Sequence, residues 1–167
     1  MDNIEIIKLD PSRWREYKEL RLEALKDSPQ AFLVTYNDEL AQPDEKWQNR
    51  IKEEGIKLFA KDNTKLIGMV GAYTERFGSI RHVAKIWGTY VNPDYRSKGV
   101  GQRLMEEVIS EIKKMPQVSK INIEVVETQI GAWGLYKKLG FKEVGRYTNQ
   151  IKTGKKYYDE ILLEMLI

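Results

Sequence analysis

Hydrophobic residues recur along the chain at two spacings, and each spacing predicts a different kind of element. Residues 12–27 carry apolar side chains three or four positions apart, which predicts a helix that Ser12 caps and Ser28-Pro29 ends. Residues 100–115 show the same period more strongly and predict a long amphipathic helix. The two helical faces are defined by Trp14, Tyr17, Leu20 and Ala24 in the first, and by Val100, Leu104, Val108 and Ile112 in the second.

Short apolar runs bounded by turn residues predict strands in much of the remaining chain. These strands are expected over residues 4–9, 56–61, 65–74, 81–91, 120–126, 141–147 and 157–166. Further helices are expected over residues 44–54 and 128–139, the second followed by Gly140, while residues 30–42 are expected to be irregular. This order predicts an α/β or α+β domain with a mixed sheet. The two strands of the unit 81–126 should run parallel, because a helix connects them.

The composition restricts the class of protein. A chain of 167 residues with 41% hydrophobic residues is enough for one domain, which we expect to span residues 1–167. We see no membrane-spanning run and no signal peptide, so we expect a cytoplasmic protein. The near balance of 28 basic and 25 acidic side chains argues against nucleic-acid binding. The absence of cysteine and the single histidine argue against disulfides, a cysteine nucleophile and a metal site.

The clearest chemical signal follows the predicted strand 81–91. A turn and a basic loop that contains Gly99 and Gly101 lead there into the next helix. A helix N-terminus presents unpaired N–H groups and the positive end of the helix dipole, and Arg96 and Lys98 add positive charge. The loop therefore suits a phosphate or a pyrophosphate.

Two known phosphate loops do not fit this segment. Gln102 follows Gly101 where the Walker A pattern needs lysine, and Leu104 stands where the dinucleotide-binding pattern needs its third glycine. An ordinary strand-to-helix turn, in which glycine serves packing, is the alternative interpretation of the loop.

Two motifs resemble one known family. Arg96-x-x-Gly99-x-Gly101, after a strand that ends Tyr90-Val91-x-Pro93, resembles the acetyl-CoA-binding motif of the GCN5-related N-acetyltransferase (GNAT) superfamily. The segment Leu135 to Phe141 is similar to that family's helix-to-strand segment and lies at the expected distance. The resemblance covers nearly the whole chain and is specific over residues 85–145. It implies a mixed, mostly antiparallel central sheet with one parallel, splayed strand pair, flanked by about four helices.

The resemblance also implies how acetyl-CoA would bind. The pyrophosphate would lie on the amides of the loop, which are those of Arg96, Ser97, Lys98, Gly99, Val100 and Gly101. The pantetheine would pair with the backbone near Tyr90 and Val91, and the amide of Val91 would face the thioester oxygen. Gln129 stands where the family usually has an asparagine that contacts the cofactor.

Two side chains are candidates for proton transfer. Tyr136 matches the family tyrosine that protonates the leaving thiolate, and its alternative is a purely structural role as a core aromatic. Glu124 matches a glutamate that serves as base in some members, and its alternative is a structural carboxylate paired with a basic neighbour. No cysteine can carry the acyl group, so we expect the amine to attack directly.

The acceptor side is expected at residues 27–43 and 147–157, because the family binds its acceptors there. Phe32 and Tyr36 are candidate acceptor-binding residues, although packing is an alternative role for such aromatics. The lining suits a small amine, an amino acid or a peptide N-terminus. A homodimer is also an expectation, because predicted strands lie late in the chain.

The sequence therefore predicts an acetyl-CoA-dependent N-acyltransferase that uses no metal. A non-catalytic acetyl-CoA sensor or interaction module of the same fold is one alternative, and another nucleotide-binding protein is a second. The acceptor, its class and the length of the acyl group are not specified by the sequence.

Overall fold

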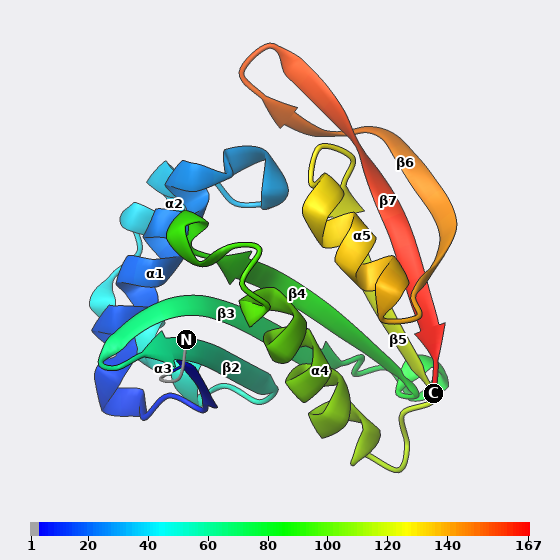
Figure 1. Ribbon diagram of the computed structural model, residues 1–167, viewed down its shortest axis with the longest axis horizontal. Helices are drawn as coiled ribbons and strands as arrows, with labels where there is room; N and C mark the ends of the chain where they lie inside the picture. The colour runs from blue at the N-terminus through cyan, green and yellow to red at the C-terminus, as the bar shows by residue number, and fades with distance from the viewer. Residues whose placement is uncertain (1–3) are drawn as a thin grey trace.

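The computed structural model describes residues 4–167, in which seven strands form one mixed sheet of order β1-β2-β3-β4-β5-β7-β6 (Figure 1). Neighbouring strands run antiparallel except β4 and β5, which run parallel as predicted. The strands are β1 (Ile4–Ile7), β2 (Ile56–Asp62), β3 (Lys65–Thr74), β4 (Val83–Val91), β5 (Lys120–Val126), β6 (Lys142–Thr153) and β7 (Lys156–Leu166).

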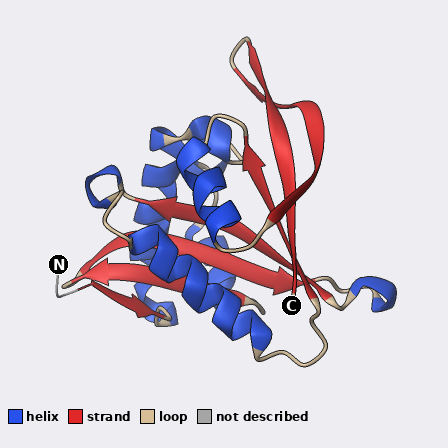
Figure 2. Ribbon diagram, turned by 45° about the vertical axis from the view of Figure 1, so that its right-hand side comes forward, coloured by secondary structure: helices blue, strands red, loops and turns tan. Residues whose placement is uncertain are grey.

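Helices lie on both faces of this sheet (Figure 2). The α-helices are α1 (Trp14–Asp27), α2 (Tyr36–Leu40), α3 (Asp44–Lys52), α4 (Val100–Lys113) and α5 (Ile130–Lys138). The apolar residues of α4 and α5 pack with one face of the strands and form the larger core. The opposite face packs against α1 and α3, where Trp14, Tyr17 and Trp47 meet Phe59 and Met69. Within the described residues, no helix combines the length and apolarity needed to cross a bilayer.

The parallel pair opens toward the carboxyl end of its strands. β4 and β5 are paired only from Val83 opposite Lys120 to Ile86 opposite Ile123, although both strands continue beyond these residues. A bulge in β4 accompanies this opening. Tyr90 pairs with Met69 and Trp87 with Gly71, so the two residues between them on β4 face one residue of β3. The first of the two is Gly88, whose φ of +66° suits glycine.

Two expectations for the N-terminal third are wrong, and local capping explains both. The cap lies at Asp10, not Ser12: its Oδ1 accepts from the Ser12 amide at 2.9 Å, which starts a 3-10 turn (Pro11–Arg13) before α1. Residues 30–42 are not irregular throughout, because Thr35 and Asp38 form a capping box that starts α2. A second 3-10 turn, Pro29–Ala31, follows α1.

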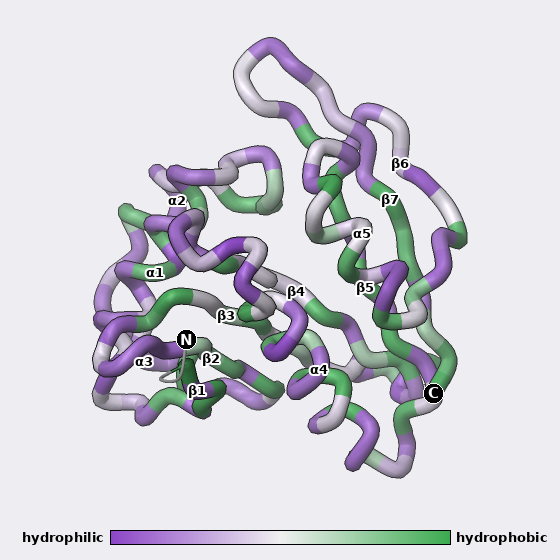
Figure 3. The backbone as a smooth tube through the Cα atoms, in the orientation of Figure 1, coloured by the Kyte–Doolittle hydropathy of each residue, from purple (hydrophilic) through white to green (hydrophobic). Residues whose placement is uncertain are grey.

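The last hairpin is longer than predicted, because β6 continues to Thr153 instead of ending at Tyr147. A bulge interrupts its pairing between Tyr147 and Ile151, and the Asp159 carboxylate accepts from the Asn149 amide there at 2.9 Å. That hydrogen bond gives the Asn149 amide an acceptor where the pairing of the two strands is interrupted. The hairpin projects from the molecule, and its tip is hydrophilic whereas the lower part of β7 is hydrophobic (Figure 3).

Candidate active site

The loop between β4 and α4 presents backbone N–H groups at the start of a 14-residue helix. Ser97 and Gly99 both have positive φ, +58° and +81°, and this curls the loop before α4 begins. The first intrahelical bond at this end runs from the Arg103 amide to Gly99 O, at 3.0 Å. The amides of residues 99–102 therefore lack intrahelical acceptors, which is the arrangement that binds phosphate groups. The amide of Arg96 is different, because it donates to Pro93 O at 3.2 Å.

The two basic side chains of the loop fold back onto the protein. Arg96 donates from Nε to Val91 O at 2.9 Å and pairs with the Asp27 carboxylate. Lys98 donates from Nζ to Asp94 O at 2.6 Å. The cradle for an anion is therefore built mainly from backbone N–H groups, and the two cations help to hold the loop in shape.

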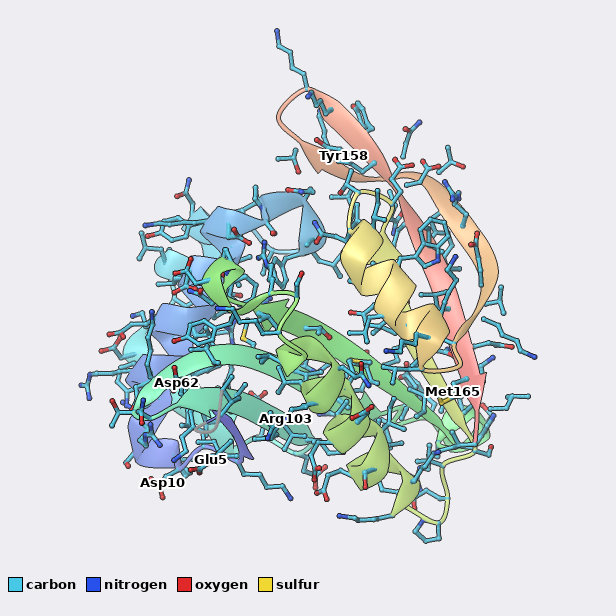
Figure 4. All side chains as sticks on the ribbon, viewed as in Figure 1. Glu5, Asp10, Asp62, Arg103, Tyr158 and Met165 are labelled. Carbon is cyan, nitrogen blue, oxygen red and sulfur yellow. The ribbon has the colours of Figure 1, made fainter. Side chains whose placement is uncertain are left out.

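Hydrogen bonds to distant elements fix the end of β4. Glu23 of α1 accepts from the Tyr90 hydroxyl at 3.0 Å and from Asn92 Nδ2 at 2.6 Å. Burial and the Glu23 carboxylate raise the pKa of the Tyr90 hydroxyl, which stays a donor. Asp62 at the end of β2, labelled in Figure 4, accepts from the Tyr95 hydroxyl at 2.9 Å. These contacts hold the loop from two sides.

The backbone of Val91 is turned toward the gap between β4 and β5. Asn92 donates its amide hydrogen to Ile67 O at 2.8 Å, so its backbone faces β3. Orientation alternates along an antiparallel strand, so the N–H of Val91 points away from β3 and that of Tyr90 points toward it. Of the two residues expected to pair with a cofactor, Val91 is the one whose amide faces the gap.

Tyr136 lies beside the same gap, on α5. Its side chain is buried, packs at 6.1 Å between ring centroids against Phe141, and lies beside the Thr89 side chain, whose hydroxyl donates to Met105 Sδ at 3.8 Å. Burial raises the pKa of the Tyr136 hydroxyl above its ordinary value of 10.0, while the neighbouring Thr89 hydroxyl acts in the opposite direction. The group is therefore protonated at neutral pH and able to donate a proton.

Glu124 lies on the opposite face of the sheet from Tyr136, one residue beyond the last β4–β5 pair. Lys85 Nζ lies 4.0 Å from its Oε1 and 3.5 Å from Glu75 Oε1. Burial opposes the charge on Lys85, but Glu124, Tyr73 and Glu75 together raise its pKa. Glu124 thus has the basic neighbour that a structural role requires, and it is also exposed enough to reach an acceptor.

Two further carboxylates and one side-chain amide lie near Glu124 and the start of α5. Burial and the nearby Glu124 raise the pKa of Glu160, which is only 7% exposed and comes from β7. Glu127 accepts from the Asp159 amide at 3.0 Å and therefore holds the last hairpin. Gln129 directly precedes α5, where its carbonyl accepts from the Trp133 amide at 3.0 Å and its side chain makes no capping hydrogen bond.

The two candidate acceptor-binding aromatics lie in different surroundings. The Phe32 ring stacks under the Arg21 guanidinium at 4.5 Å, close to β4. Tyr36 begins α2 and packs under Lys26 at 4.6 Å instead. A cavity of about 190 Å³ opens beside Arg21 and Trp87, and Tyr36 does not line it. Phe32 does not line this cavity either, but its ring supports the Arg21 guanidinium, which does.

Two of these positions were not predicted from the sequence, although each carried a signal. Arg21 stands four residues after Tyr17, on the apolar face of α1, where a charge is unusual. Gly88 interrupts a predicted strand, which is typical of a bulge or of a close backbone approach. A hollow of about 1140 Å³ around Tyr73 and Phe77, at the far end of β3, is lined by none of the predicted site residues.

Known proteins share this arrangement. A model of the acetyltransferase (GNAT) family matches residues 14–141 of the chain. The [ribosomal protein bS18]-alanine N-acetyltransferase of Escherichia coli is 32% identical over 84 residues, which cover 50% of this chain and 56% of that protein. The L-amino acid N-acetyltransferase AaaT of Escherichia coli is 29% identical over 146 residues, which cover 86% of this chain and 83% of that protein.

The fold agrees with the same family. The crystal structure of an acetyltransferase of the GNAT family from Streptococcus pneumoniae has a TM-score of 0.88 at 20% identity, and the match covers 98% of this chain and 99% of that chain. This confirms the predicted mixed sheet with one splayed parallel pair. The chain spans only about half the length of the first curated relatives, since the matches cover 43% and 56% of them.

Proposed function

Since the chain belongs to the acetyltransferase (GNAT) family, we propose that it is an N-acetyltransferase that uses acetyl-CoA to acetylate a primary amine. The acceptor is a small molecule or a peptide N-terminus, and residues 1–167 act as one domain. One observation carries the proposal: the open N-terminus of α4 lies at the end of the same splayed strand whose Thr89 contacts Tyr136. An anion cradle and a proton donor therefore flank one gap in the sheet.

The backbone around the gap fits acetyl-CoA. The amides of residues 99–102 are free to hold its pyrophosphate. The space beside Gly99 is open, because a β-carbon there would meet no described atom within 4 Å apart from those of Gly99 and its two chain neighbours. The N–H of Val91 faces the gap, where it can donate to the thioester oxygen. Gln129 directly precedes α5, at the position where the family places a cofactor contact.

Acetyl-CoA, when bound, supplies a thioester whose carbonyl carbon the acceptor nitrogen attacks, so that a C–N bond forms and the C–S bond breaks. Tyr136 donates its proton to the leaving sulfur, and its raised pKa keeps that proton in place beforehand. Glu124 accepts the proton that the amine releases, from the other face of the sheet. The chain contributes no covalent nucleophile to this scheme.

The curated relatives support an amine acceptor. One is named as an alanine N-acetyltransferase of a ribosomal protein and another as an L-amino acid N-acetyltransferase. Both names describe acetylation of a nitrogen of an amino acid, which is an alanine of a ribosomal protein in one and an L-amino acid in the other. An α-amino group is therefore the acceptor that we propose.

Isothermal titration calorimetry with acetyl-CoA tests the cofactor part of the proposal. Ser97→Asp places a negative charge in the cradle, and Ser97→Asn is its neutral control of the same shape. Both residues tolerate the positive φ of this position. We expect the native protein and Ser97→Asn to bind acetyl-CoA with similar affinity, and Ser97→Asp to bind it about 10-fold more weakly. No binding by the folded native protein would refute acetyl-CoA as the substrate.

Release of the coenzyme A thiol in the presence of amines tests the reaction. The panel contains L-amino acids and a peptide with an N-terminal alanine, and mass spectrometry identifies the acetylated product. Binding of acetyl-CoA without transfer to any amine would instead support the non-catalytic sensor.

A further inference from the structure

Arg21 is a buried cation whose guanidinium has no anionic partner among residues 4–167. The residue is 8% exposed, and its Nη1 is buried without a hydrogen-bond partner within the described chain. Burial lowers the pKa of Arg21, yet an arginine side chain stays charged in proteins. The nearby carboxylate of Glu39 already pairs with Arg50 through two contacts. One of them, from Arg50 Nη2 to Glu39 Oε1, is 3.2 Å long. A buried charge in this state favours an anion that comes from outside the chain.

The unpartnered nitrogen lies at the bulge of β4. Arg21 Nη1 is 3.6 Å from the position that a β-carbon on Gly88 would occupy, and no other described atom lies within 4 Å of that position apart from those of Gly88 and its two chain neighbours. The side chain of the next residue, Thr89, lies beside the Tyr136 hydroxyl. The guanidinium therefore lies within one residue of the strand segment where acyl transfer is proposed.

Packing holds the guanidinium in place. It lies over the Phe32 ring at 4.5 Å, and a cavity of about 190 Å³ opens beside it. Tyr17, Val34 and Trp87 border this cavity, together with two acidic and two basic residues, Glu39, Glu53, Arg50 and Lys57. This volume is below the roughly 300–1,000 Å³ of typical ligand pockets, so it suits one small polar group or a short side chain.

Carboxylates lie on the other side of the gap, on the same face of the sheet. Glu124 is one residue past the last β4–β5 pair, and Glu160 follows on the neighbouring strand β7. Arg21 faces the gap from the β4 side. The acceptor face thus presents a positive group on one side of the gap and negative groups on the other.

On the basis of the proposed function, we infer that the acceptor is a free α-amino acid and that Arg21 binds its α-carboxylate. An α-amino acid carries an ammonium group and a carboxylate on one carbon, which matches this opposition of charge. A peptide N-terminus has a neutral carbonyl at that place, which leaves Arg21 without its counter-ion. Arg21 is thus a specificity-determining residue that separates free amino acids from peptide acceptors.

The native protein provides the first test. The initial rate of coenzyme A release is measured with each L-amino acid, its amide and the corresponding decarboxylated amine. We expect the best amino acid to exceed its amide by about 100-fold in kcat/KM, as loss of a charge-assisted contact predicts. Equal rates for acid and amide overturn the inference and leave the proposed function intact. No transfer to any amine, with acetyl-CoA still bound, overturns both.

Three variants assign the preference to Arg21. Arg21→Met removes the charge, Arg21→Lys keeps it, and Arg15→Met is the control on an exposed position of the same helix. We expect Arg21→Met to raise KM for the amino acid about 100-fold and to leave the Kd for acetyl-CoA unchanged. Arg21→Lys should retain part of the preference for the acid over the amide, and Arg15→Met should match the native protein. An Arg21→Met protein that keeps the acid-over-amide ratio overturns the assignment. If Arg21→Met does not fold, the acid-over-amide ratio of Arg21→Lys decides. An Arg21→Lys ratio equal to the native ratio overturns the assignment.

Discussion

The Tyr136 hydroxyl lies beside the Thr89 side chain, and this proximity links the splayed part of β4 to α5. Thr89 is the second residue of the β4 bulge, so the bulge turns this hydroxyl to the face on which α5 packs. The contact brings the predicted proton donor to the point where the two parallel strands separate. It also predicts that the donor is ordered before any substrate binds.

Tyr136→Phe tests the proton donor. The change removes the hydroxyl and keeps the ring that packs on Phe141, so we expect stability to change little and kcat to fall about 100-fold. The Kd for acetyl-CoA, measured by calorimetry, should stay within a factor of about two. Native turnover by Tyr136→Phe, where chemistry limits the rate, would exclude the acid role.

Glu124→Gln tests the base. Two carboxylates share Lys85, and only Glu124 borders the gap, so the matched control is Glu75→Gln. We expect kcat to fall about 100-fold in Glu124→Gln and to stay near the native value in Glu75→Gln. Steady-state kinetics with a saturating amine measure both. Equal losses in the two variants would indicate that the charge on Lys85 matters and that Glu124 is structural.

Gly99→Ala tests the geometry of the loop. The φ of +81° disfavours a β-carbon, so we expect a loss of about 1 kcal/mol in the free energy of unfolding. Gly154→Ala, in the last hairpin at φ +61°, should cost a similar amount, because neither position is crowded. Only Gly99→Ala should weaken acetyl-CoA binding. Chemical denaturation and calorimetry measure the two effects, and equal affinities in both variants would argue against the loop as the pyrophosphate site.

Glu111 gives the protein a pH-dependent contact between α4 and the residue after β1. Hydrogen bonds from Lys114 and, at 2.8 Å, from Lys8 lower its pKa from 4.5 to about 2. A carboxyl group whose pKa is lower in the folded than in the unfolded protein stabilises the folded state at pH values above its unfolded-state pKa. This stabilisation is lost as the pH falls through the folded-state pKa. The difference in Tm between the native protein and Glu111→Gln should therefore be full above pH 4.5 and shrink toward pH 2. A difference that stays constant over this range would contradict the assignment, and Glu143→Gln, on exposed β6, is the control.

The sequence by itself determined the elements that local spacing controls. The strand over residues 120–126 and the start of the helix at Val100 are found where the pattern predicts them, and Gly140 follows α5 with φ +102°. These features depend on residues within about four positions of one another. The parallel direction of β4 and β5 was also predictable, because a connecting helix permits little else.

The tertiary structure alone decided which groups meet at the gap. Nothing local to Arg96 shows that its charge is held by Asp27 of α1, and nothing local to Arg21 places its Nη1 at Gly88 of β4. Both contacts join residues more than sixty positions apart, so they depend on how α1 packs on the sheet. A sequence pattern reports spacing along one element, whereas a buried charge and its partner depend on the docking of two elements. For that reason the motif predicts the proposed acetyl donor, and only the folded chain suggests the acceptor.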